Sequence, residues 1–64
     1  MSDYYMTTEE VAAALRIEPQ TLRYWRHAGK GPASFRVPGT RRVLYAREDV
    51  ETFIEDARQS NASA

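Results

Sequence analysis

The first third of the chain has apolar residues at helical spacing, and a helix-start signal precedes them. Val11 and Leu15 lie on one face of a helix with 3.6 residues per turn. Thr7 and Glu10 are three residues apart in the sequence TTEE, which is a capping box: the threonine hydroxyl accepts from the Glu10 N–H while the glutamate reaches back. This pattern predicts a helix from about residue 8 to residue 15 or 16.

A second helix is predicted after a turn of three residues, 16–18. Pro19 suits the first position of a helix, where its missing N–H costs no hydrogen bond. Gly29 suits the position just after the end, because glycine adopts the left-handed conformation found there. Leu22 and Trp25 share the side expected to be buried. Two short helices joined by a tight turn are typical of a helix-turn-helix unit.

The opposite face of the second helix is polar. At 100° per residue it holds Gln20, Tyr24 and His27, with Arg23 and Thr21 at its flanks. Such a face has the donors, acceptors and ring surface needed to contact bases in a major groove. The alternative is an ordinary solvated helix face, but the neighbouring elements favour DNA contact. The candidate contacts from this helix are Gln20, Thr21, Arg23, Tyr24, Arg26 and His27.

Two short runs rich in β-formers follow, over residues 34–37 and 42–45, with the turn PGTR between them. They predict a hairpin that is basic at its tip and along its second strand. Its arginines either keep an exposed edge soluble or contact the minor groove and phosphates, and the basic helix beside it favours the second interpretation. The candidate contacts from the hairpin and its flanks are Lys30, Arg36, Thr40, Arg41 and Arg42.

A third helix is predicted from residue 47, because Val50, Phe53, Ile54 and Ala57 repeat at amphipathic spacing. The sequence QSNASA, residues 59–64, is expected to be a flexible tail. The predicted fold is mainly α with a small β-hairpin, a minimal winged helix-turn-helix over residues 1–58.

Charge along the chain is segregated, although the 64 residues have a net charge of zero. Residues 16–47 hold eight basic side chains and one acidic one, whereas both ends are acidic. A single-sign block in a neutral chain creates a polarised surface, which is what a polyanion responds to. The charge distribution therefore predicts double-stranded DNA as a partner.

Other function classes have little support in the composition. The chain has no cysteine and one histidine, so no metal site, cofactor site or catalytic residue is predicted. No apolar stretch approaches the roughly 20 residues of a membrane span. We expect a cytoplasmic, nucleoid-associated protein of a bacterial cell that is not an enzyme and does not contact membranes.

The order of these elements resembles the small DNA-binding domains of the excisionase and MerR-like superfamily, over about residues 5–58. The matching segments are MTTEEVAAALRI, TLRYWRHAGKGP and RRVLYAREDVETFI. The chain is most similar to the stand-alone excisionases of actinobacterial phages, in its Gly31-Pro32 exit and in residues 42–49. The positions that the family uses for packing are Val11, Ala12, Leu15, Ile17, Leu22 and Trp25.

Three residues depart from the family pattern. Arg16 stands where a glycine is usual, which predicts a slightly strained or differently angled turn. Thr40 is an extra residue in the wing and is expected to change its reach into the minor groove. Ala46 replaces a usual Ser or Thr cap, so the last helix is expected to begin less firmly.

The resemblance implies an architectural protein, a recombination directionality factor. Such proteins bind tandem sites beside a phage attachment site, associate cooperatively with neighbouring copies, bend the DNA and direct an integrase toward excision. Two alternatives stay open: a small MerR-like or AlpA-like transcriptional regulator with the same fold, and a module that binds a protein partner through its acidic ends.

Overall fold

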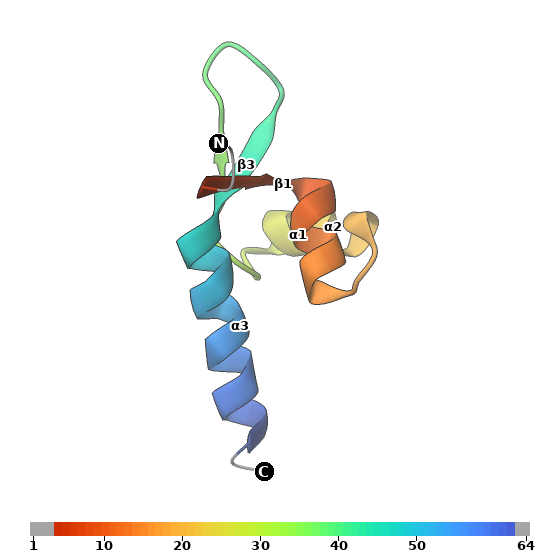
Figure 1. Cartoon of the computed structure of the whole chain (residues 1–64). Coiled ribbons are helices and arrows are strands. Elements are labelled where there is room, and N and C mark those ends of the chain that lie inside the picture. The colour runs from red at the N-terminus through yellow and green to blue at the C-terminus, as the bar shows by residue number, and fades with distance from the viewer. Residues whose placement is uncertain (1–3, 63–64) are drawn as a thin grey trace.

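The computed structural model describes residues 4–62, which form three helices and a small antiparallel sheet (Figure 1). Along the chain the elements are β1 (Tyr5–Thr7), α1 (Thr8–Leu15), α2 (Pro19–Ala28), β2 (Phe35–Arg36), β3 (Val43–Ala46) and α3 (Arg47–Ala62). The predicted fold class, mainly α with a small hairpin, is confirmed.

The first two helices have the bounds and the end signals that the sequence predicts. The Thr7 N–H donates to the Glu10 carboxylate at 2.9 Å, and the Glu10 N–H donates to the Thr7 hydroxyl at 3.1 Å, which completes the capping box. At the other end, Gly29 ends α2 in the left-handed conformation, with φ of 76°. Local signals therefore place both helices.

The turn between α1 and α2 contains the strained residue that the sequence predicts. Arg16 has φ of 61° and ψ of 42°, and it is the only non-glycine residue of the described chain with a positive φ. Its N–H and that of Ile17 donate to the carbonyls of Ala13 and Ala12, which closes the end of α1. Glycine adopts this conformation without the clash that a Cβ atom brings.

The sheet has three strands in the order β1-β3-β2, where the sequence predicts two. β3 is central, and Tyr5 of β1 pairs with Ala46 while Phe35 of β2 pairs with Leu44. β1 was not predicted, because three residues are too few to show an alternating pattern. The strand attaches the start of the chain to the hairpin and sets the position of α1.

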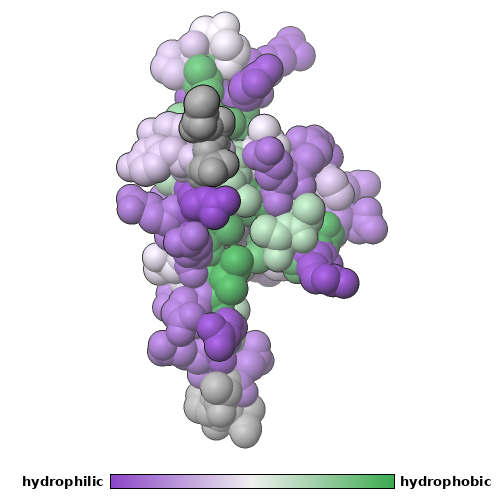
Figure 2. Space-filling view, in the orientation of Figure 1, coloured by the Kyte–Doolittle hydropathy of each residue, from purple (hydrophilic) through white to green (hydrophobic). Residues whose placement is uncertain are grey.

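A small core lies where α1, α2, β3 and the first turn of α3 meet. Its buried residues are Val11, Ala12, Leu22, Tyr45 and Val50, with Met6, Leu15, Ile17, Trp25, Val43 and Ile54 packed around them. The predicted core position of Trp25 is confirmed in part: the ring is half-buried and lies 6.1 Å from the ring of Phe53. On the face in Figure 2, hydrophobic residues form a narrow strip between hydrophilic margins.

The last helix extends away from the rest of the molecule (Figure 1). It starts at Arg47, directly after β3, and continues to Ala62. The structure differs from the predicted flexible tail in one respect: residues 59–62 are helical. Gln59 donates to the Glu55 carboxylate and the Asn61 side chain donates to the Ala57 carbonyl, so polar contacts extend the helix beyond its apolar face. The last two residues of the predicted tail lie outside the described chain.

None of the helices in residues 4–62 combines the length and the apolar character that a membrane span requires.

Candidate nucleic-acid interface

The exposed face of α2 has the composition that the sequence predicts. Gln20, Tyr24 and His27 are exposed, and the Tyr24 ring has 64% of its surface accessible. Leu22, on the other side of the helix, is 1% exposed and fixes which face points outward. Thr21 is half-buried at one flank. The helix therefore presents a row of polar side chains to the solvent.

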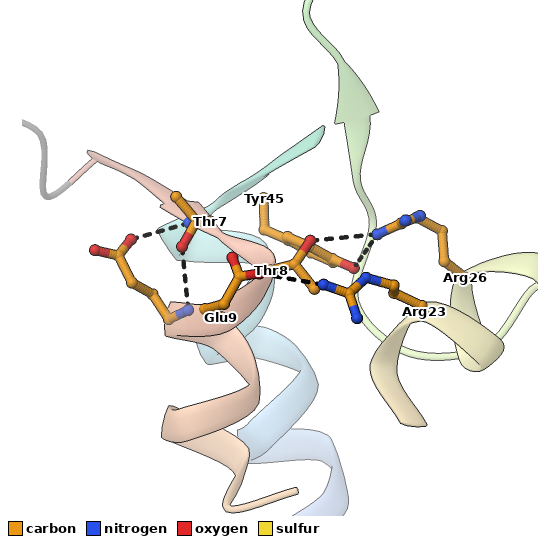
Figure 3. Close-up of polar contacts among 7 residues, drawn as sticks. Thr7, Thr8, Glu9, Arg23, Arg26 and Tyr45 are labelled. Atoms are coloured by element: carbon orange, nitrogen blue, oxygen red, sulfur yellow. Dashed lines mark hydrogen bonds and ion pairs between the residues drawn. The ribbon is translucent and has the colours of Figure 1, made fainter. Parts of the chain in front are cut away.

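Arg23 lies at the other flank of this face and is paired. Its guanidinium Nη2 is 3.2 Å from the Glu9 carboxylate of α1 (Figure 3). Both side chains are largely exposed, at 48% and 67%. No pattern in the sequence indicates this partner, because Glu9 and Arg23 are 14 positions apart and only the fold brings them together.

Arg26 turns toward the interior of the molecule. Its Nη1 donates to the Thr8 hydroxyl at 3.4 Å and to the Tyr45 hydroxyl at 3.3 Å (Figure 3). These bonds connect α2 to the start of α1 and to β3, and they give the hydroxyl of the 1%-exposed Tyr45 a partner. Arg26 thus has a structural function in addition to any contact with a ligand.

The wing, residues 35–46, has an exposed tip. Residues 38–42 are all exposed, and the Val37 N–H donates to the Arg42 carbonyl below them. The Thr40 hydroxyl donates to the Val37 carbonyl at 2.9 Å and accepts from the Arg42 N–H at 3.1 Å. The extra residue of the wing therefore closes its turn from within.

Side chains from α1, α2 and the wing line a common pocket of about 390 Å³, called the arginine pocket below. Its lining residues are Thr7, Thr8, Glu9, Arg23, Arg26, Arg41, Arg42 and Val43. Four arginine residues and one glutamate line it, so the pocket has a positive excess. Guanidinium groups match the geometry of phosphate oxygens. This arrangement is chemically suited to bind an oxyanion.

The fold brings together only some of the predicted residues. Arg23, Arg26, Arg41 and Arg42 share the arginine pocket. Gln20, Thr21 and Tyr24 line a separate shallow depression with Glu18. The remaining candidates lie outside both depressions; they are His27, Lys30, Arg36 and Thr40.

A cluster of aromatic side chains on the outer face of the sheet was missed. The rings of Tyr4 and Tyr5 are 4.8 Å apart, and the ring of Phe35 is 5.6 Å from that of Tyr5. All three are exposed, and Tyr5 and Phe35 lie on the face of the sheet opposite the buried Tyr45. Phe35 is distant in the sequence from the adjacent Tyr4 and Tyr5, and the pairing of β1 and β2 with β3 brings them together. Within residues 4–62, no three His, Cys, Asp or Glu side chains are grouped to hold a metal ion.

Comparison with known families gives one match. The model of a helix-turn-helix domain matches residues 5–58, the range over which the sequence resembles the excisionase-like proteins. That family includes excisionase-like small DNA-binding proteins. No curated protein and no solved structure matches the chain significantly.

Proposed function

The chain belongs to the helix-turn-helix domain family, and from this premise we propose that it is a phage-type excisionase. In this proposal it binds tandem sites in double-stranded DNA, bends them and directs an integrase toward excision. The observation that supports the proposal is the placement of an exposed polar helix beside a basic wing, with the arginine pocket between them.

Each part of this surface has a distinct proposed contact. α2 enters the major groove, where Gln20, Tyr24 and His27 contact base edges. Thr21 and Lys30 contact flanking phosphates, and Arg36 of β2 contacts a phosphate as well. Arg41 and Arg42 at the wing contact the adjacent minor groove or its phosphates. Arg26 acts as a positioning residue through Thr8 and Tyr45.

The size of the domain supports assembly on DNA. A single module of this kind buries about 600–1,000 Å² of protein surface on DNA, at the lower end for specific binding. The protein is 43 Å along its longest axis, comparable to the roughly 34–36 Å between half-sites one helical turn apart. Copies on neighbouring sites therefore lie within reach of one another. We propose that they associate cooperatively, in the cytoplasm of a bacterial host.

A second candidate is a small transcriptional regulator of the MerR-like or AlpA-like kind. The family match favours it equally, because a helix-turn-helix domain serves both functions. The two candidates predict different binding sites: direct repeats for the excisionase, and a lone site or an inverted pair for the regulator.

The test selects binding sites from a random DNA pool and measures affinity for the enriched sequence at two salt concentrations. We expect direct repeats about one helical turn apart, cooperative binding and a steep salt dependence. Circular-permutation gel shifts then measure bending, and an excision assay with an integrase encoded beside the gene measures directionality. A lone site or an inverted pair contradicts the excisionase proposal, and no enrichment contradicts DNA binding itself.

Two charge-matched variants localise the contact surface. Arg41→Ala removes a positive charge at the wing, and Arg58→Ala removes one from the far part of α3, where it pairs with Glu55. We expect Arg41→Ala to weaken binding to all sequences. The slope of the logarithm of the binding constant against the logarithm of the salt concentration should become shallower by about one. Arg58→Ala is expected to bind like the parent protein. Equal losses in both variants contradict the proposed surface.

A further inference from the structure

We infer that the arginine pocket binds one phosphate of the DNA backbone and that Glu9 sets its affinity by holding Arg23 until that phosphate displaces it. The inference rests on the proposed DNA-binding function and adds a site and a control residue to it. It is carried by three features of the pocket: its charge, the fixed position of one arginine, and the weak pairing of another.

The charge of the pocket is mostly uncompensated. Glu9 is the only carboxylate among the lining residues, against the guanidinium groups of two elements. Within residues 4–62, the ion pairs leave out Arg26, Arg41 and Arg42. A concave surface with several unpaired guanidinium groups favours an anion with several oxygen acceptors, and a phosphodiester has this chemistry.

Arg26 is already held in place. Both of its partners, the hydroxyls of Thr8 and Tyr45, are neutral, so its position is fixed while its positive charge is retained. Binding an anion next to a preoriented guanidinium costs less conformational entropy than ordering a free side chain. Arg26 therefore forms a rigid wall of the pocket, whereas the wing arginines form its exposed side.

Arg23 differs from Arg26 because its partner is charged and replaceable. Glu9 and Arg23 pair at 3.2 Å with about half or more of each side chain exposed, and ion pairs this exposed are weak. Glu9 has no part in the capping box, which uses Thr7 and Glu10. The polar partner of Glu9 is Arg23, and a phosphate that enters the pocket competes with Glu9 for the same guanidinium group.

This competition lowers affinity for any DNA that does not fill the pocket. A duplex seated on both α2 and the wing brings a phosphate close enough to replace the Glu9 carboxylate. A loosely attached duplex leaves Arg23 paired and meets the negative charge of Glu9. Glu9 is thus a specificity-determining residue that acts through Arg23.

A double-mutant cycle tests the inference. Parent, Glu9→Gln, Arg23→Ala and the double variant are titrated by fluorescence anisotropy with the enriched duplex and with a scrambled one. We expect Glu9→Gln to tighten binding by about two- to fivefold when Arg23 is present, more for the scrambled duplex, because the ion pair no longer competes. With Arg23→Ala, Glu9→Gln is expected to change affinity by less than about 1.5-fold.

Glu10→Gln is the matched control for charge. It removes a negative charge one residue away, and glutamine keeps the capping box intact. If Glu10→Gln tightens binding as much as Glu9→Gln, or if the effect of Glu9→Gln persists without Arg23, Glu9 acts only as a general negative charge and the inference is overturned. If the parent binds no duplex, the proposed function and this inference fail together.

A methylphosphonate scan of the enriched duplex locates the phosphate. Neutralising one particular phosphate is expected to weaken binding of the parent more than binding of Arg23→Ala. If no phosphate has this effect, the result contradicts the proposed site. Inorganic phosphate identifies the source of the ligand: Arg23 side-chain NMR shifts with free phosphate indicate a general phosphate site, and shifts only with DNA indicate a site completed by the duplex. If the Arg23 side-chain signals shift with neither ligand, the proposed site is overturned.

Discussion

The helix-turn-helix segment, residues 8–28, and the wing, residues 35–46, are stabilised in different ways. In the first, α1 has a capping box, α2 ends on a left-handed glycine and Leu22 is buried between them. In the wing, β2 has two residues, and the tip beyond it is exposed and closed by the hydrogen bonds of Thr40. Most of the buried side chains lie in the first region, and most of the unpaired positive charge of the arginine pocket comes from the second.

This difference indicates how a small domain divides its tasks. Regions with few buried contacts open at low free-energy cost, whereas regions in the core open only on global unfolding. A rigid α2 keeps base-contacting side chains in register, and a compliant wing adapts to the groove beside it. Substitutions of buried residues in the first region should therefore change stability, and those at the exposed tip of the wing should change binding with little change in stability.

The largest expected effect is on the packing of α2. Leu22→Ala removes a fully buried side chain and is expected to lower the free energy of unfolding by about 2–5 kcal/mol, measured by urea denaturation. That loss is large for so small a domain. Tyr24→Ala, on the exposed face of the same helix, should change stability by less than about 0.5 kcal/mol. Equal losses contradict the assignment of the two faces.

The bounds of the helix-turn-helix segment were predictable because each of its signals is local. The capping box spans four residues, and Pro19 and Gly29 mark the ends of α2 by their own backbone chemistry. The strained turn at Arg16 was predictable from the family resemblance, which has a glycine at that position. Such signals need no knowledge of what lies elsewhere in the fold.

The parts that were not predictable depend on contacts between distant segments. β1 exists because Tyr5–Thr7 pairs with β3 some 40 residues later. The inward turn of Arg26 depends on two hydroxyls from other elements, whereas periodicity placed it only near the edge of the buried face. The end of α3 was missed because residues 59–62 lack apolar spacing and are held by polar contacts.

The second prediction concerns Arg26, which joins the two regions. Arg26→Ala removes its bonds to Thr8 and Tyr45 and leaves the buried Tyr45 hydroxyl without its partner. We expect a loss of about 1–2 kcal/mol in unfolding free energy, toward the lower end for bonds to a charged group because both distances are long. Tyr45→Phe in the Arg26→Ala background should restore part of it. No recovery would show that the hydroxyl does not depend on Arg26.

The third prediction sharpens the contrast between two left-handed positions in the helix-turn-helix segment. Arg16→Gly relieves a Cβ clash that costs roughly 1–2 kcal/mol, offset in part by the greater freedom of glycine in the unfolded chain. We expect a net gain of about 0.5–1 kcal/mol, seen as a rise of several degrees in Tm. Gly29→Ala is the reverse control: no atom obstructs the added Cβ, so the loss of stability reports backbone strain, offset in part by the lower freedom of alanine in the unfolded chain. A fall in Tm for Arg16→Gly contradicts the strain.

The smallest effect on stability is expected in the wing. Thr40→Ala removes the hydroxyl that bonds to Val37 and Arg42, but these groups are exposed, so water replaces it and unfolding free energy changes by less than about 0.5 kcal/mol. The turn itself should loosen, because only the two backbone bonds, from the Thr40 N–H to Val37 and from the Val37 N–H to Arg42, are left to close it. Hydrogen exchange at the Arg42 amide measures this loosening.

Binding then separates two functions of Thr40. If the residue acts by shaping the wing, Thr40→Ala lowers DNA affinity in proportion to the faster exchange of Arg42, and Thr40→Ser, which keeps the hydroxyl, restores both. If its hydroxyl instead leaves the turn to contact DNA, the Arg42 amide exchanges faster in the DNA-bound parent than in the free protein. The donor and acceptor bonds of that hydroxyl within the wing favour the first outcome. A turn that is shaped by local hydrogen bonds, and that adds little to global stability, is what the contrast with α2 requires.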